Sequence, residues 1–167
     1  ILNDSLFFFR RNQLWGAIDH RGRQMAPNRF QSWRRLSDSY FIFQVGAQNL
    51  LFSSICKGIV TDGKTYDDYY PLTTRYIITR KDKSLGLIDW CGRAIISPLY
   101  DEILLHSPSV FRVNLKGQWA LLKEGDQELT PFKYSYIAPP KGPVSIVKYG
   151  QDFGLINGEG KELTAVK

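Results

Sequence analysis

The stretch Trp15-Gly16-Ala17-Ile18-Asp19-His20-Arg21-Gly22-Arg23 decides the fold, because similar stretches recur along the chain. Leu85-Gly86-Leu87-Ile88-Asp89-Trp90-Cys91-Gly92-Arg93 and Phe153-Gly154-Leu155-Ile156-Asn157 repeat it in the same register. Looser copies are Trp119-Ala120-Leu121-Leu122-Lys123 and Asn49-Leu50-Leu51-Phe52-Ser53. The aligned anchor positions are 16, 50, 86, 120 and 154, so the spacings are 34, 36, 34 and 34 residues. A fixed period of this length is typical of repeat architectures.

The flanks of each anchor keep the same period. Bulky residues stand nine and seven positions before most anchors, as in Phe41/Phe43, and an apolar residue stands nine positions after each anchor. An aromatic residue and a second large residue three positions later then follow, as Phe30/Trp33, Tyr66/Tyr69, Tyr100/Ile103 and Tyr134/Ile137. The second pair is displaced by two residues, which places the extra length of the 36-residue spacing between Thr61 and Tyr66.

Each unit is predicted to contain three short strands. An alternating first strand, such as Val110–Asn114, leads through a turn into a second strand, such as Gln118–Leu122. A glycine-bearing turn then leads into an extended segment that carries a proline in three units and the aromatic pair. No stretch has a 3.6-residue period, so we expect an all-β chain.

The period also bounds the architecture. We predict a single repeat domain over residues 1–167, with units at about 6–37, 38–73, 74–107, 108–141 and 142–167, the last one incomplete. A unit of this length cannot bury its own hydrophobic face. Neighbouring units must therefore stack. Four-stranded propeller blades need roughly 40 residues or more. Units of about 34 residues therefore favour an open, twisted, β-solenoid-like array of three-stranded units, with a propeller-like closed ring as the alternative.

The anchor glycines predict a close approach of backbone. At each one, we expect either the preceding strand or the backbone of the next repeat to pass nearby, because glycine within a strand marks such contacts.

The repeated blocks resemble the WG-repeat (KWG) family of bacterial proteins. The resemblance rests on Leu14–Asp19, on Gln118–Leu122 and on Ile95-Ile96-Ser97-Pro98-Leu99-Tyr100-Asp101-Glu102-Ile103. It implies a β-rich interaction array and carries over no catalytic residue. The second repeat departs from the pattern, with Asn49-Leu50 in place of Trp-Gly and Cys56 in place of the turn glycine.

The charge of the chain is concentrated in its first repeat. The 22 Lys and Arg residues against 16 Asp and Glu give a net charge of +6. Residues 1–37 hold seven arginines against two aspartates, which accounts for +5 of that total. Arginine suits phosphate and carboxylate groups. A polyanion or nucleic-acid surface is therefore one hypothesis, and a solvated basic face is the interpretation that we favour; the candidate residues are Arg10, Arg11, Arg21, Arg23, Arg34 and Arg35.

Three aromatic residues break the repeat pattern, Trp90 and the weaker cases Tyr70 and Tyr149. Trp90 stands four positions after its anchor, where the other units have His20, Ser54, Glu124 and Gly158. A tryptophan in a polar turn is expected to be partly exposed and is a candidate anchor for a partner, with packing on a neighbouring repeat as the interpretation that we favour. Tyr70 is a weaker candidate for the same surface.

The two cysteines, Cys56 and Cys91, lack the C-x-x-C spacing of metal sites. The sequence leaves their pairing open, and we favour two independently buried thiols over a disulfide between them.

No motif for a nucleotide, calcium or zinc occurs, so we expect no cofactor and no metal. The two histidines, His20 and His106, have no spacing to a nucleophile and a carboxylate that indicates catalysis. No apolar stretch is long enough for membrane insertion. We therefore predict a non-catalytic binding or scaffolding module. Its expected partner is a protein, a glycan or another domain of the parent protein, with nucleic acid as the alternative.

Overall fold

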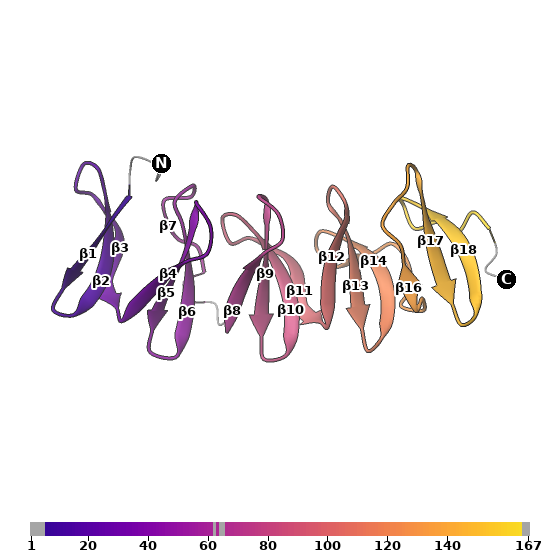
Figure 1. Ribbon diagram of the computed structural model, residues 1–167, viewed down its shortest axis with the longest axis horizontal. Coiled ribbons are helices and arrows are strands. Elements are labelled where there is room, and N and C mark those ends of the chain that lie inside the picture. Colours follow the sequence, from indigo (N-terminus) through magenta and orange to yellow (C-terminus); the bar gives the residue numbers. More distant parts are fainter. Residues whose placement is uncertain (1–5, 62, 64–65, 165–167) are drawn as a thin grey trace. The chain divides into compact units, whose positions relative to one another are not determined.

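Within the part of the chain that the structure describes, every regular element is a β-strand. The computed structural model describes residues 6–61, 63 and 66–164. Its eighteen strands in these residues form five antiparallel sheets of three or four strands, none of them closed into a barrel (Figure 1). The all-β prediction is confirmed. The described residues contain no helix that is long and apolar enough to cross a membrane.

The five sheets share a hairpin of two six-residue strands joined by two residues. The hairpins are β1 (Leu6–Arg11) with β2 (Leu14–Asp19), β5 (Tyr40–Val45) with β6 (Gln48–Ser53), β9 (Tyr76–Lys81) with β10 (Ser84–Asp89), β13 (Val110–Leu115) with β14 (Gln118–Lys123), and β17 (Val144–Tyr149) with β18 (Asp152–Asn157). Turn residues such as Lys116 and Gly117 have φ of 53° and 81°. Two-residue hairpins favour this left-handed backbone because it matches the twist of the strands.

Shorter or longer strands flank the hairpins. The second strand of a hairpin pairs with β3 (Gln24–Phe30), β7 (Gly58–Ile59), β11 (Ala94–Tyr100) or β15 (Gln127–Glu128). The first strand pairs with β4 (Ser32–Arg35), β8 (Asp68–Pro71), β12 (Glu102–Ser107) or β16 (Tyr136–Ile137). The predicted count of three strands per unit is right for the first and fifth sheets and wrong for the middle three, which have four.

The additional strand comes from the aromatic pairs. The second member of each pair lies in a strand that pairs with the following hairpin, as Trp33 does opposite Phe43. The sheets therefore cover residues 6–30, 32–59, 68–100, 102–128 and 136–157, and their boundaries fall between the two members of each pair. The bounds of the sheets therefore differ from those of the predicted units, which were 6–37, 38–73, 74–107, 108–141 and 142–167. The physical reason is that a donated strand satisfies the backbone groups along the edge of the next hairpin.

Two of the anchor glycines, Gly16 and Gly86, are explained by the third strand of their own sheet. A Cβ at Gly86 would lie 2.9 Å from the carbonyl oxygen of Ile96, and one at Gly16 would lie 3.1 Å from that of Ala26. Both oxygens belong to the seven-residue strands β3 and β11. The expected neighbour, a preceding strand or the backbone of the next repeat, is therefore wrong for Gly86; at Gly16 the ring of Phe9, from the preceding strand, lies near the Cβ position as well.

The second and fourth repeats do not need glycine at the anchor. Their third strands, β7 and β15, have two residues and pair only with residues 52–53 and 122–123. These strands stop short of the anchor, so Leu50 and Ala120 fit there and are buried. The predicted insertion between Thr61 and Tyr66 falls mostly on residues 62, 64 and 65, which lie outside the described residues.

The chain divides into two compact units, one of residues 1–82 and 88–93 and the other of residues 83–87 and 94–167. Within each unit, consecutive sheets cover one another. We define the forward face of a sheet by the residues one before, one after and eight before the anchor. We define its rear face by the residues nine and seven before and two after the anchor. The forward face of a sheet packs against the rear face of the next.

Buried clusters show this contact in both units. In the first unit, Ala17 of the first sheet packs on the rear face of the second sheet, and Ile42 and Leu51 of the second sheet pack on Ile77 and Ile88 of the third. In the second unit, the forward face of the fourth sheet packs on Val147 and Ile156 of the fifth, through Leu121 and the half-buried Trp119. The predicted stacking of neighbouring repeats is therefore present within each unit.

The turns after the second strands stack as well. A Cβ at Gly92 would lie 2.1 Å from the carbonyl oxygen of Val60, and one at Gly160 would lie 2.5 Å from that of Leu129. Both glycines have a φ of 81°. Gly22 holds the same slot in the first sheet with a φ of 77°, and a Cβ there would meet nothing within 4 Å.

Alanine substitutions at Gly22 and Gly92 separate two reasons for glycine in these turns, the left-handed backbone and the close contact with the preceding sheet. We expect Gly22→Ala to lower the free energy of unfolding by about 1–2 kcal/mol, because alanine disfavours the left-handed backbone of this turn. Gly92→Ala also creates a clash with the backbone of Val60. It should therefore lower the free energy of unfolding by about 1–3 kcal/mol more than Gly22→Ala does. Urea unfolding of both variants measures the difference, and equal losses would contradict a stacking role for Gly92.

Candidate binding surface

The turns after the second strands of the first three sheets form one edge of the first unit. We name residues 20–23, 54–57 and 90–93 the turn edge. A disulfide between Cys56 and Cys91 joins its second and third turns. A cavity lined by both the first and the second turn connects those two. The turn edge contains three of the predicted candidate residues, Arg21, Arg23 and Trp90.

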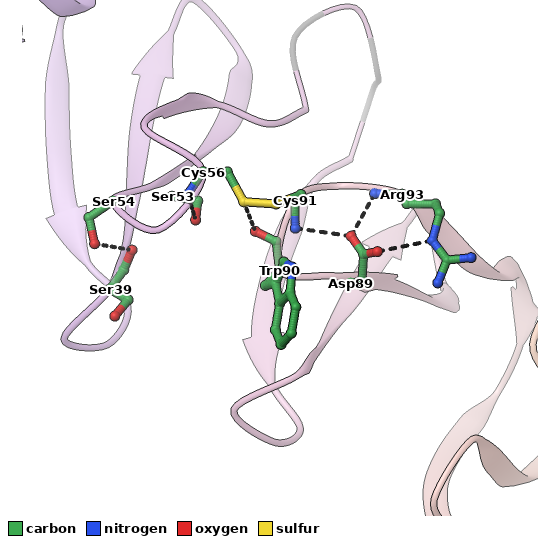
Figure 2. The surroundings of a disulfide bond; sticks show 8 residues. All are labelled: Ser39, Ser53, Ser54, Cys56, Asp89, Trp90, Cys91 and Arg93. Carbon is green, nitrogen blue, oxygen red and sulfur yellow. Dashed lines mark hydrogen bonds and ion pairs between the residues drawn. A yellow bond between two sulfur atoms is a disulfide. The ribbon is translucent and has the colours of Figure 1, made fainter.

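An aspartate fixes the backbone of the first and third turns. The Oδ1 of Asp89 accepts hydrogen bonds from the backbone nitrogens of Cys91 and Arg93, at 3.0 and 2.9 Å (Figure 2). Its Oδ2 accepts a hydrogen bond from Nε of Arg93, at 3.0 Å. Burial raises the pKa of the Asp89 carboxyl, but the hydrogen bonds from Arg93 and Cys91 outweigh it and leave the pKa below its usual value. Asp19 holds Arg21 and Arg23 in the same way. These turns therefore display the residue next to the aspartate, His20 or Trp90, in a fixed geometry.

Cys56 and Cys91 form a disulfide, with 5.6 Å between their Cα atoms (Figure 2). The interpretation as two independently buried thiols is therefore wrong. The reason lies in the stacking, because the two cysteines are 35 residues apart, close to one repeat period. Equivalent turns of consecutive sheets lie next to each other, so the spacing itself was the signal for the pairing.

A cavity of about 410 Å³ opens between the first and second turns. Charged and polar groups at its wall come from Asp19, His20, Arg23, Ser54 and Lys57, and apolar side chains come from Leu6, Met25 and Ile55. In the third and fifth sheets a turn glycine packs on the preceding sheet at this place. In the second sheet Cys56 holds that slot and is directed toward Cys91, which leaves the space beside Met25 open.

Two large apolar side chains are exposed on the turn edge beside the disulfide. Trp90 is 43% exposed and Ile55 is 51% exposed. Figure 2 shows the backbone of Trp90 beside the disulfide, with the Sγ of Cys56 3.5 Å from the carbonyl oxygen of Trp90 and the indole directed away from the sulfur atoms. The expected partial exposure of Trp90 is observed, and Ile55 is a candidate residue that the sequence did not single out.

The arginines of the candidate set do not form one surface. Arg10 and Arg11 lie at the far end of the β1–β2 hairpin from the turn edge, because the six residues of β2 separate the two ends. Arg34 and Arg35 lie on β4 in the second sheet and form ion pairs with Asp68 and Asp38. Arg23 is paired with Asp19 at 3.0 Å. Tyr70 lies on β8 and is 40% exposed.

The two histidines lie in different surroundings. His20 is exposed, and its Nε2 accepts a hydrogen bond from Nε of Arg21 at 3.3 Å. His106 is buried, with its Nε2 3.4 Å from the hydroxyl of Ser145. Burial, and then the nearby Arg112 cation, lowers the pKa of His106 to about 4. Over residues 6–61, 63 and 66–164, no group of three or more His, Cys, Asp or Glu side chains is placed to hold a metal ion.

Comparison with known proteins gives only distant similarity. No protein-family model matches the chain, and no curated protein matches it. The chain is similar to the solved structure of KlHsv2 with loop 6CD replaced by a Gly-Ser linker, at 11% identity and a TM-score of 0.43, over 96% of this chain and 62% of that one. It is similar to a crystal structure of the eukaryotic initiation factor at the same identity and TM-score, over 97% of this chain and 52% of that one. The chain thus spans less than two thirds of either protein, and similarity at this level assigns no function.

Removal of the disulfide tests the link between the second and third turns. Closing a loop of 35 residues is worth about 2–4 kcal/mol. We expect the Cys56→Ser, Cys91→Ser double variant to lose about that much free energy of unfolding, measured by urea titration. Reductant should lower the stability of the wild type to the same extent and leave the variant unchanged. A wild type insensitive to reductant would contradict the link.

The buried imidazole predicts a pH dependence. The pKa of His106 is about 4 in the folded chain, against about 6.5 when unfolded. The unfolded chain therefore binds the extra proton between these values, and stability falls as the pH drops from 7 toward 4. Thermal unfolding at several pH values should show a shallower fall for His106→Gln, with the exposed His20→Gln as the control. Identical profiles for His106→Gln and the wild type would refute the assignment.

Proposed function

We propose that this chain is a non-catalytic binding and scaffolding module of the WG-repeat type. Its turn edge in the first unit binds a protein or glycan partner. The observation that carries the proposal is the cavity lined by the exposed Ile55, on a turn that the disulfide joins to the turn of the exposed Trp90. Concave sites with apolar walls and a few oriented polar groups are the usual places for ligands.

The chemistry of the turn edge favours a ligand with both apolar and polar groups. Trp90 and Ile55 offer apolar contact area, which suits an aromatic or aliphatic side chain or the face of a sugar ring. Lys57 adds a cation at the cavity wall, where Arg23 is paired with Asp19, and Ser54 adds a hydroxyl. A partner with a carboxylate or hydroxyl groups next to an apolar group matches this set.

The turn edge is also held rigid before a partner arrives. The aspartate hydrogen bonds fix two of its turns, and the disulfide joins two of them. A preorganised surface loses less conformational entropy on binding, which raises affinity without adding contacts.

We further propose that the five sheets form an open, twisted, solenoid-like array of repeats, not a closed ring. The support is the recurrence of one contact type, forward face on rear face, within both units. Each sheet then requires only its neighbours, as expected for a linear repeat protein. Nucleic-acid binding by the first repeat is the weaker alternative, because Arg23, Arg34 and Arg35 are already paired with carboxylates.

Exposed residues on the turn edge allow a direct test. Binding to a glycan panel and to a displayed peptide library is measured for the wild type, Trp90→Ala and Lys57→Glu. We expect the selected ligands to bind Trp90→Ala at least about tenfold more weakly, as for an aromatic anchor. Tyr136→Ala removes a similarly exposed aromatic, 48% exposed, from the second unit and should bind normally.

Salt dependence separates the two kinds of partner. Binding through the turn edge should weaken only slightly between about 50 and 200 mM salt, whereas binding to phosphates weakens by orders of magnitude. Normal binding by Trp90→Ala, together with steep salt dependence, would overturn the proposal in favour of a polyanion.

A further inference from the structure

At three of the four places where one sheet follows another, the turn after the second strand closes on the preceding sheet. A Cβ at Gly92 would meet the carbonyl oxygen of Val60, and the turn glycine of the fifth sheet packs in the same way. In the fourth sheet the backbone nitrogen of Gly125 donates a hydrogen bond to the carbonyl oxygen of Ile95, at 2.8 Å. Each receiving carbonyl lies nine or ten residues after its anchor, and each contact lies within one compact unit. The backbone of a glycine-containing turn therefore fits this place.

The turn of the fourth sheet also places a carboxylate against the preceding strand. Asp126 follows Gly125, and its Oδ1 and Oδ2 lie 3.0 and 3.2 Å from the backbone nitrogen of Ser97. Its Oδ2 accepts a hydrogen bond from the Ser97 hydroxyl, at 2.5 Å. A glycine followed by an acidic residue thus binds the outer edge of β11 through one backbone contact and one side-chain contact.

The place between the first and second sheets is a cavity instead. Met25 lines this cavity of about 410 Å³ and lies nine residues after its anchor, as Ile95 does. The following turn has Ile55 and Cys56 in place of the glycine and aspartate of the fourth sheet. The side chain of Cys56 is bonded to Cys91 in the third sheet, so it cannot turn back toward the first sheet. The described part of the chain therefore does not fill this place.

The wall of the cavity suits an acidic group. Its charged residues are Lys57, Arg23 and Asp19, and Asp19 accepts Nε of Arg23 at 3.0 Å. In the part of the chain that the structure describes, Lys57 forms no ion pair, so the wall carries one cation in excess. The side chain of Arg23 is 68% exposed, and a guanidinium has further N–H donors besides Nε. Pro27 holds the position of Ser97 and has no N–H, so a carboxylate in this cavity finds its donors in the two cations.

We infer that the partner of the turn edge is a protein that inserts an acidic, glycine-containing loop of the Gly-Asp kind into this cavity. The backbone of the loop takes the position beside β3 that Gly125 takes beside β11. Its carboxylate faces Lys57 and Arg23, and an apolar side chain that flanks the loop contacts the exposed Ile55. The inference rests on the proposed function, because it names the partner of the same cavity, and it selects a peptide over a glycan.

The chain itself provides the probe, a labelled cyclic peptide with the sequence of residues 123–128. Its binding to the full chain is measured by fluorescence anisotropy. We expect the peptide with Asp126→Asn to bind about tenfold more weakly, because a hydrogen bond to a charged group is lost. The peptide with Gly125→Val should also bind more weakly, because the φ of 79° at this glycine disfavours a branched side chain.

Two variants of the chain provide a matched comparison. Lys57→Glu reverses the charge at the cavity wall and should weaken binding of the unmodified peptide at least about tenfold, because like charges then face each other. Arg11→Glu makes the same change of charge at an exposed residue at the far end of the β1–β2 hairpin, so it should bind like the wild type. Equal binding of the unmodified and Asp126→Asn peptides, or equal binding by the two variants, would overturn the inference.

The outcome also separates this inference from the proposed function. If the peptide of residues 123–128 does not bind, while a glycan or a peptide without an acidic residue binds the wild type and is lost in Trp90→Ala, the inference is wrong and the proposed function stands. If no glycan and no peptide binds the wild type, both are wrong.

Discussion

Each hairpin in this chain has two apolar faces, and only a neighbouring sheet can cover either of them. Strand β5 shows the constraint most clearly, because Phe41 and Phe43 pack toward the first sheet whereas Tyr40 and Ile42 pack toward the third. Full burial of one such side chain is worth about 1.5–3 kcal/mol. A single sheet of three or four strands forgoes most of this energy. The stability of each sheet therefore depends on the sheets next to it.

The same stacking builds the turn edge. Consecutive sheets have the same arrangement of strands and turns, so their equivalent turns lie next to each other. The residue at one turn therefore contacts the neighbouring sheet. Glycine at position 92 permits the closest approach. Cys56, in the equivalent slot of the second sheet, bonds to Cys91 and leaves a cavity on its other side. One departure from the repeat thus produces both the covalent link and the hollow that we propose as a binding site.

Much of the fold follows from the sequence, because the period and the alternation of side chains are both visible in it. The hairpins and the partial exposure of Trp90 agree with the predictions. The donated strands were missed, because backbone pairing carries no side-chain signal that tells Trp33 to join the following hairpin. Phe7 is exposed although its slot is buried elsewhere, since no sheet precedes it among the described residues.

The candidate site was less predictable than the fold. Trp90 could be found because it breaks the polar pattern of the turns. The pairing of Cys56 with Cys91 had a signal, the separation of 35 residues, that becomes meaningful only once neighbouring turns are known to stack. The arginines of the first repeat are close in sequence, but strand direction carries them to different ends of their sheets, and net charge gives no information about that separation.

The central claim is that stability resides in local interfaces between consecutive sheets. Residue-resolved amide hydrogen exchange of Val147→Ala tests it, because Val147 is fully buried where the fourth and fifth sheets meet. The account predicts lost protection in β13, β14, β17 and β18, with β1 and β2 unchanged. A uniform loss of protection along the whole chain would show a single cooperative core and contradict it.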